Sequence, residues 1–356
     1  QNRFQAAPVV LSRAALKRSG GRVACVVVNA GCANAVTGRA GLDAARRVRS
    51  RAAELVGCPA EQVFLASTGV IGVILPDAKI RATLPASVMR LSVSGLTAAS
   101  QAILTTDVGP KVAQRTYRWA GRRGRIVGFA KGAGMIHPNM ATMLAFIMTD
   151  APATPAFLKT ALKEASDHSF NTISVDGDTS TNDTVLVMAS GRLGGPKMVS
   201  PAAAGARSFR RALDEVCRDL ALMIVRDGEG ATRLMEIQVR GARTAREAQL
   251  AAHAVATSPL VKTALFSGDP NWGRILATVG RSGARFSPRR VSLSVGDLTL
   301  VSGGSPVAYR ESDAARRFSR ERVQVTIDLG AGRAIASRIT CDLGHDYVSL
   351  NADYRS

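Results

Sequence analysis

Short apolar runs alternate with amphipathic stretches along this chain, and the alternation limits its fold more than any other feature. The run "VACVVV" (23–28) is rich in β-branched residues and ends at Asn29-Ala30-Gly31, so it predicts a buried strand. From Leu42 to Leu55 the apolar residues fall three or four apart, which predicts a helix with its arginines toward solvent. Further strands are predicted at 63–66, 184–189, 234–240 and 322–330, and further helices over 155–165, 209–223 and 245–256. The mixture indicates an α/β or α+β fold.

Local signals mark where some of these elements begin. Thr154 before Pro155 is a typical helix start, and Thr244 with Glu247 three residues later is a candidate capping box. The opening residues "QNRFQAAPVVLSR" are interpreted as a basic turn that feeds a short apolar strand. They read as the middle of a longer chain, so we expect residues upstream, and any targeting segment would lie among them.

Composition narrows the class of protein. With 356 residues and 46% hydrophobic composition, the chain can bury the core of one large domain or two ordinary ones. The net charge of +20 favours a polyanionic partner, but the arginines are spread out and lack interleaved aromatic residues, so solvated faces are the preferred interpretation. Neither the scattered histidines nor the cysteines have metal-site spacing, and no apolar run reaches the roughly 18 residues of a membrane span. The cysteines are expected to be free thiols in a reducing, cytoplasmic setting.

The stretch "KGAGMIHPNMATMLAFIMTDA" (131–151) carries the chemistry. Its glycine-rich turn delivers Thr142 to an apolar run, Met143 to Met148, that predicts a buried strand. A threonine hydroxyl becomes a good nucleophile when the residue is the first of a chain, because its own α-amine then takes the proton. Cleavage of the Ala141–Thr142 bond by the same hydroxyl would create that terminus. The alternative is an ordinary junction between a loop and a strand.

Other motifs add polar groups at turns. In "ASTGVIG" (66–72) the backbone N–H groups of Thr68 and Gly69 lie on a tight turn after a strand, where they could stabilise an oxyanion. The remaining motifs are "LTTD" (104–107), "DGDTSTNDT" (176–184), "RDGEGATR" (226–233), "GDPNWGR" (268–274) and the closing "NADYRS". Each is a weak signal alone, because an acidic glycine turn is usually just a turn.

Together and in this order, the motifs resemble the ornithine acetyltransferase family, also called glutamate N-acetyltransferase or the arginine-biosynthesis bifunctional enzyme. The resemblance covers the chain from "NRFQAAPV" to "NADYRS", and its most specific element is "KGAGMIHPNMATMLAF". It implies a precursor that cleaves itself at Ala141–Thr142 into an α chain (1–141) and a β chain (142–356). It also implies an α/β fold of stacked sheets flanked by helices, with an N-terminal-nucleophile-like core. Residues 142–233 would complete that core, and about 234–356 would form a smaller C-terminal domain.

The resemblance also implies roles for individual residues. Thr142 would be the nucleophile of both cleavage and catalysis, and Thr68 and Gly69 would form the oxyanion hole. The implied substrate-binding residues are Thr105, Lys131, Thr142, Glu229, Asn351 and Ser356. The implied reaction moves the acetyl group of N2-acetyl-L-ornithine to L-glutamate through an acetyl-threonine ester, with acetyl-CoA as a second donor in some family members. No metal or organic cofactor is needed, and the cleaved chains would form an α2β2 assembly.

Two alternatives stay open. A self-cleaving aminopeptidase or amidase would use the same N-terminal threonine without transfer to glutamate. A basic nucleic-acid-binding protein is suggested only by the charge. The location would be organellar rather than cytoplasmic if an upstream targeting segment exists, and Cys32 in "NAGCANA" (29–35) receives no role.

Overall fold

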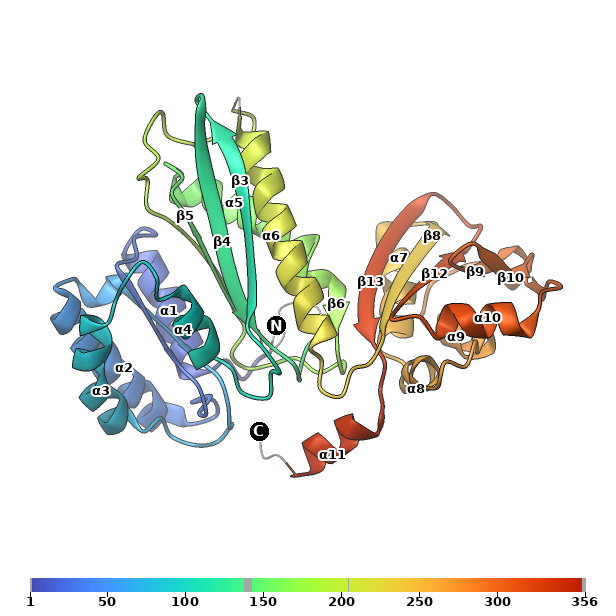
Figure 1. The fold of residues 1–356 in the computed structure, drawn as a ribbon, viewed down its shortest axis with the longest axis horizontal. Coiled ribbons are helices and arrows are strands. Elements are labelled where there is room, and N and C mark those ends of the chain that lie inside the picture. The colour runs from blue at the N-terminus through green and yellow to red at the C-terminus, as the bar shows by residue number, and fades with distance from the viewer. Residues whose placement is uncertain (1, 138–142, 204, 354–356) are drawn as a thin grey trace. The chain divides into compact units, whose positions relative to one another are not determined.

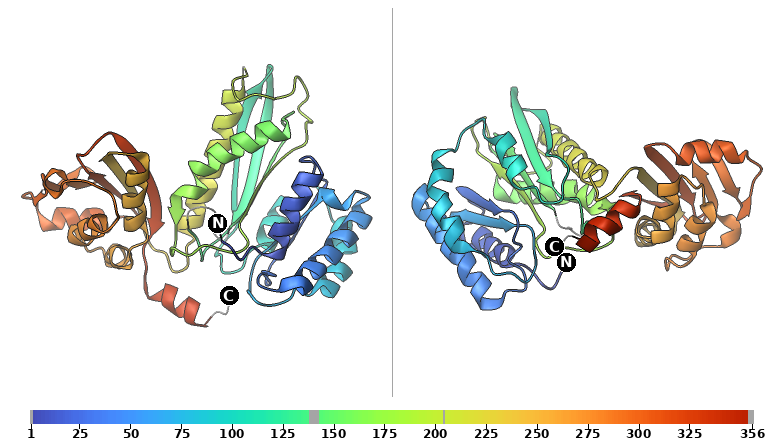
Figure 2. Two further views of the ribbon diagram at one scale, coloured as in Figure 1. Left: turned by 180° about the vertical axis from the view of Figure 1, so that it is seen from behind. Right: turned by 60° about the horizontal axis from the view of Figure 1, so that its bottom comes forward.

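The computed structural model describes residues 2–137, 143–203 and 205–353. The chain divides into two compact units. Unit 1 takes in the chain up to Asn171 together with Asp178–Ile224, and unit 2 takes in Thr172–Gly177 together with the chain from Val225 through the last helix. Figure 1 and Figure 2 show the elements of each unit. The smaller C-terminal domain from about residue 234 stays a prediction; unit 2 begins earlier in the chain and also contains the short segment 172–177.

Unit 1 contains a parallel pair of strands, a four-stranded sheet and the helices that cover them. Its helices are α1 (Ala7–Arg18), α2 (Gly38–Val56), α3 (Asp77–Met89), α4 (Leu96–Ala102), α5 (Pro155–Asp167) and most of α6 (Ala206–Arg226). Its strands are β1 (Cys25–Asn29), β2 (Val63–Ser67), β3 (Lys111–Trp119), β4 (Arg122–Lys131), β5 (Leu144–Thr149) and β7 (Thr184–Ala189). The strand orders are β1-β2 and β3-β4-β5-β7.

The two sheets of unit 1 stack on each other, with helices outside both. One face of β1 and β2 packs on α1, α2 and α3, as Val48 and Leu65 illustrate. The other face meets the second sheet, where Ala66 shares a cluster with Phe129 and Phe146. On the far side of that sheet, Phe209 of α6 packs edge-on against Tyr117 of β3 at 5.1 Å between ring centroids. The unit therefore has four layers, helix–sheet–sheet–helix, which confirms the predicted α/β fold of stacked, helix-flanked sheets (Figure 1).

Strand β5 runs through the middle of this stack. Its residues are nearly all buried, because the other sheet covers one face and α6 covers the opposite one. A strand covered on both faces needs a continuous apolar run, and "LAFIM" supplies it. β5 pairs antiparallel with β4, from Ile126↔Thr149 to Lys131↔Leu144, and parallel with β7.

Unit 2 is a seven-stranded sheet packed against helices. The strand order is β11-β10-β9-β12-β8-β13-β6. The strands are β6 (Ile173–Ser174), β8 (Leu234–Ala242), β9 (Ser292–Val295), β10 (Leu298–Ser302), β11 (Ser305–Pro306), β12 (Arg322–Asp328) and β13 (Ala334–Cys341). The helices are α7 (Ala245–Ala256), α8 (Pro259–Ser267), α9 (Trp272–Gly280), α10 (Glu311–Phe318) and α11 (His345–Asp353). The core is aliphatic, with Leu265 and Phe318 packed on the valines and isoleucines of β8 and β12.

Most predicted elements are confirmed, and one is wrong. Thr154 accepts a hydrogen bond from Phe157 N–H at the start of α5, and Thr244 accepts one from Glu247 N–H at the start of α7. The opening residues, predicted as a turn and strand, form helix α1 instead. Pro8 near its first turn suits a helix start, and Leu11 and Ala15 bury one face at four-residue spacing.

Two further observations concern the whole of the described chain. All five cysteines are free thiols. None of the helices in the described parts of the chain has both the length and the apolar character needed to cross a lipid bilayer.

Candidate active site

The turn after β2 is held in place by the loop after β1. Ala33 N–H donates to the carbonyl of Val70 at 3.0 Å, which fixes the two segments side by side. Gly69 has φ +124°, and a Cβ at this position would lie 2.3 Å from the carbonyl carbon of Gly31. Only glycine fits so close to another backbone in this conformation. The structure therefore confirms the tight turn predicted from "STG".

Of the two backbone N–H groups predicted to stabilise an oxyanion at this turn, that of Thr68 already has a partner. Thr68 N–H donates to the carbonyl of Asn29 at 3.0 Å, because the parallel pairing of β1 with β2 continues past Ser67. This N–H is therefore not available to an oxyanion. Gly69 N–H has no hydrogen-bond partner among the described residues. The groups that the turn can offer are the Gly69 N–H and the hydroxyl of Thr68.

A buried lysine joins the turn to two other segments. Lys131, the last residue of β4, is 2% exposed. Its ammonium nitrogen lies 2.8 Å from Thr105 Oγ1 and 3.3 Å from Thr68 Oγ1, and it donates to both hydroxyl oxygens. It also lies 3.3 Å from a carboxylate oxygen of Asp107. The structure thus brings together Thr68, Thr105 and Lys131, three predicted site residues that are far apart in the sequence.

Asp107 is the centre of this cluster, and sequence reasoning noted it only as part of "LTTD". Its side chain is fully buried between Lys131 and Lys111, whose ammonium lies 2.7 Å from Asp107 Oδ1. Gly132 N–H donates to the same oxygen at 2.6 Å. Burial alone would raise the pKa of Asp107, but the charges of Lys131 and Lys111 and these hydrogen bonds outweigh it and lower the pKa. The carboxylate therefore stays ionised and fixes the lysine that faces Thr68.

Removing this carboxylate should destabilise the fold. In Asp107→Asn two buried lysines lose their carboxylate, so we expect the free energy of unfolding at neutral pH to fall by about 3 kcal/mol. The pKa of Asp107 is lowered in the folded state, so its contribution to the stability of the fold depends on pH. This contribution is complete above the ordinary carboxyl pKa of about 4 and is lost as the pH falls through the lowered pKa. Urea unfolding at neutral pH measures the loss of stability in Asp107→Asn, and urea unfolding at decreasing pH measures the pH dependence.

Asp43→Asn is the matched control for that experiment. Asp43 lies 2.6 Å from Arg46 on the surface of α2, and its side chain is 41% exposed. Exposed ion pairs contribute roughly 0–1 kcal/mol, so the control should unfold almost as the unaltered protein does. If the two variants have the same urea midpoint, the buried carboxylate does not hold the cluster together.

The start of β5 lies beside a second carboxyl group. Ala141 and Thr142 lie outside the described residues. Met143 is 1% exposed; its N–H donates to Asp183 Oδ1 at 3.2 Å, and its carbonyl accepts from Thr184 N–H at 3.0 Å. Burial raises the pKa of Asp183 well above its ordinary value, although the bond from Met143 opposes this. The residue after the predicted nucleophile is therefore held at both of its backbone polar groups.

Two of the predicted substrate-binding residues meet within unit 2. Asn351 on α11 donates from its side-chain amide to Glu229 Oε2 at 2.8 Å, and Glu229 follows the end of α6. Both side chains are accessible, so this pair can exchange its mutual contact for a ligand. Ser356 lies outside the described residues.

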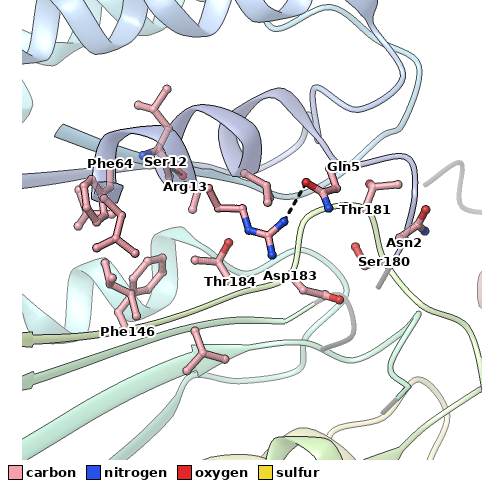
Figure 3. A pocket seen from close by; sticks show the side chains of 17 residues that line it. Asn2, Gln5, Ser12, Arg13, Phe64, Phe146, Ser180, Thr181, Asp183 and Thr184 are labelled. Atoms are coloured by element: carbon pink, nitrogen blue, oxygen red, sulfur yellow. Dashed lines mark hydrogen bonds between the residues drawn. The ribbon is translucent and has the colours of Figure 1, made fainter. Parts of the chain in front are cut away.

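A cavity of about 480 Å³ lies between α1, β2 and β7 in unit 1. Figure 3 shows Phe64 and Phe146 at one end and Ser180, Thr181 and Asp183 toward the other, with Arg13 bonded to Gln5 along one side. Sequence reasoning assigned no site here. The groups around Asp183 could have been suspected only from the polar run "DGDTSTNDT" before an apolar strand.

Among the described histidines, cysteines and carboxylates, no group of three could hold a metal ion.

The fold and the cluster define a class. The cluster offers a glycine N–H that has no partner among the described residues and a hydroxyl that accepts a hydrogen bond from a buried lysine. Backbone N–H groups and polar side chains of this kind are the groups with which acyl-transfer enzymes stabilise an oxyanion. Comparison with known proteins gives the particular family.

Residues 1–356 match the model of the ArgJ family. The arginine biosynthesis bifunctional protein ArgJ of Symbiobacterium thermophilum is 49% identical over 355 residues, covering 100% of this chain and 88% of that relative. The protein of the same name from Geobacter sulfurreducens is 46% identical over 359 residues, covering 100% and 90%. The crystal structure of arginine biosynthesis bifunctional protein argJ from Bacillus halodurans superposes with a TM-score of 0.56 at 38% identity, covering 59% of this chain and 98% of that one.

The chain therefore belongs to the ArgJ family. The family predicted from the sequence motifs is confirmed, and with it an acyltransferase of arginine biosynthesis. The aminopeptidase and nucleic-acid alternatives are not favoured by any of these comparisons.

Proposed function

We propose that this chain transfers the acetyl group of N2-acetyl-L-ornithine to L-glutamate through an acetyl ester on Thr142. The observation that carries the proposal is the bonding of the buried Lys131 ammonium to both Thr68 and Thr105, in a chain of the ArgJ family. The cluster lies at the end of β4, whose last residue pairs with Leu144, two residues after Thr142. The relatives carry the word "bifunctional" in their names, so we extend the proposal to acetyl-CoA as a second acetyl donor.

The first step would be self-cleavage. The Thr142 hydroxyl attacks the carbonyl of Ala141, the peptide nitrogen leaves as the new α-amine, and water opens the resulting ester. The products are the α chain 1–141 and the β chain beginning at Thr142. The pairing of β4 with β5 supports their continued association, because it joins strands from the two sides of the cleaved bond. We propose that the chains assemble further as α2β2.

The second step would be acetyl transfer. The α-amine of Thr142 takes the proton of its hydroxyl, and the oxygen attacks the acetyl carbonyl of acetylornithine. The Gly69 N–H and the Thr68 hydroxyl would donate to the oxyanion, and the charge of Lys131, which bonds to the Thr68 hydroxyl, would favour it. Ornithine leaves with the proton, and the amine of glutamate then attacks the ester and departs as N-acetylglutamate. Thr105, Lys131, Glu229, Asn351 and Ser356 are the proposed substrate-binding residues.

A labelling experiment tests this reaction. Cleaved enzyme is incubated with acetylornithine labelled in its acetyl group, quenched, digested and analysed by mass spectrometry. We expect the label on the peptide that begins at Thr142, and we expect added glutamate to remove it as labelled N-acetylglutamate. Labelled acetyl-CoA in the same protocol tests the second donor.

The controls distinguish the alternatives. Label that appears only as free acetate, with or without glutamate, would support the amidase interpretation instead. Absence of label from the Thr142 peptide under all conditions would contradict the acetyl-threonine intermediate.

A further inference from the structure

Asn182 and Asp183, two consecutive residues just before β7, bond to two different parts of the proposed site. Asn182, 2% exposed, extends toward the loop after β1 and the end of β2, whereas Asp183 extends toward the start of β5. All of these contacts lie within unit 1. Neither residue has a role in the steps proposed above.

Asn182 fixes the peptide that leads into the glycine turn. Its side-chain nitrogen donates to the carbonyl of Ser67 at 2.8 Å and to the carbonyl of Ala33 at 2.7 Å, which uses both of its hydrogens. Its oxygen accepts from the hydroxyl of Thr181 at 2.6 Å, which determines the orientation of the amide. The Ser67 carbonyl belongs to the same peptide group as Thr68 N–H. Asn182 therefore holds the turn one peptide before the Gly69 N–H.

Asp183 fixes the start of β5, the segment that follows the proposed nucleophile. Its carboxyl accepts from Met143 N–H, and the neighbouring Thr184 N–H holds the Met143 carbonyl. Met143 N is bonded directly to the carbonyl carbon of Thr142, and a peptide C–N bond is only about 1.33 Å long. An anchor on that nitrogen is therefore an anchor on the backbone of the nucleophile.

We infer that Asn182 and Asp183 are positioning residues that set the separation between the Thr142 nucleophile and the Thr68–Gly69 turn. The inference rests on the proposed function of those three residues. Consecutive Cα atoms are about 3.8 Å apart, so the two anchors cannot move independently of each other. Such control matters because a displacement of about 1 Å between reacting groups can cost on the order of 100-fold in rate.

Asn182 acts as a hydrogen-bond donor to its partners and Asp183 as an acceptor, so exchanging their amide and carboxyl groups should have different effects at the two positions. Asn182 must donate two hydrogen bonds from its amide nitrogen, and Asn182→Asp would instead aim a carboxylate oxygen at the carbonyl oxygens of Ser67 and Ala33. Asp183 needs only to accept one, and the amide oxygen of Asp183→Asn still accepts from Met143 N–H. Burial already raises the pKa of Asp183, so a neutral side chain suits its surroundings. The two substitutions exchange the same atoms at adjacent positions.

The measurement is kcat and KM for acetylornithine, with enzyme concentration set by the amount of acetylated Thr142 peptide. For Asn182→Asp and for Asp183→Ala we expect kcat to fall roughly 10- to 100-fold while KM changes little, because the substrate-binding side chains are untouched. Asp183→Asn should keep most of kcat, since it keeps the acceptor. Thr184→Val is the matched control, because within the described parts of the chain the Thr184 hydroxyl bonds only to the carbonyl of Asn182, and the substitution leaves the backbone N–H of residue 184 in place.

Several outcomes would overturn the inference. One such outcome is that the Asn182→Asp protein folds and keeps the kcat of the unaltered enzyme. Another is that Asp183→Asn lowers kcat as much as Asp183→Ala does. If Asn182→Asp does not fold, the comparison of the two Asp183 variants decides alone. A kcat loss in every variant that parallels a loss of melting temperature would indicate a structural role only. Failure of the proposed function is separate, because it appears as unlabelled Thr142 in the unaltered protein.

Discussion

A Thr142→Ala protein is expected to remain one chain on a denaturing gel, whereas the unaltered protein separates into two fragments. The physical reason is that the hydroxyl supplies the only attacking atom in the proposed cleavage, and alanine has none. Sequencing the larger fragment of the unaltered protein should give Thr-Met-Leu-Ala-Phe, the order that follows Ala141. The variant should also lose acetyl transfer, because both the nucleophile and the free α-amine are absent.

Thr142→Ser separates chemistry from side-chain packing in this experiment. Serine keeps a hydroxyl at the same position, so slow cleavage and measurable transfer should return. Since Met143 is held by Asp183 and Thr184 in any case, the strand should form in all three proteins, and their melting temperatures should be similar. Splitting of Thr142→Ala at the same bond would show that another group attacks it.

Local chemistry explains which elements the sequence could predict. The caps at Thr154 and Thr244 and the apolar stripe of α2 are decided by residues a few positions apart, and each forms as predicted. The β3–β4 hairpin was not predicted, because arginines and glutamine alternate with small or aromatic residues along it. The face of the hairpin that α6 covers is stabilised by residues distant in the sequence, where Arg115 bonds to Glu215 on α6 at 3.2 Å.

In the candidate site too, features set by neighbouring residues could be predicted from the sequence, whereas contacts between distant segments could not. The glycine turn follows from "STG", but no spacing rule joins Thr68 to Thr105 and Lys131, which meet only when β2 and β4 are stacked. The motif resemblance supplied that grouping. The use of the Thr68 N–H by Asn29 depends on how far the β1–β2 pairing extends, and sequence patterns do not determine this. Asn182 and Asp183 were missed for a similar reason, since their partners lie far away along the chain.

The second large effect is expected at Gly69. In Gly69→Ala the new Cβ would lie 2.3 Å from the Gly31 carbonyl carbon and 2.6 Å from Cys32 N, and both are backbone atoms that cannot rotate away. The turn must therefore shift, and the Gly69 N–H shifts with it. Losing one well-aimed oxyanion donor costs on the order of 10²–10³ in kcat, or about 3–4 kcal/mol. We expect a loss of at least this size, measured as turnover of acetylornithine by cleaved enzyme.

Gly72→Ala in the same turn separates this displacement from simple backbone strain. Gly72 also has a positive φ, of +83°, but a Cβ there would meet nothing within 4 Å. The control therefore introduces the unfavourable conformation, which costs roughly 1–2 kcal/mol of stability, without pushing the turn away from the loop after β1. Its melting temperature should fall while its kcat stays near that of the unaltered enzyme. If Gly69→Ala and Gly72→Ala lose the same small amount of activity, the Gly69 N–H is not an oxyanion donor, and the stabilising groups must be sought in Thr68 and Lys131 alone.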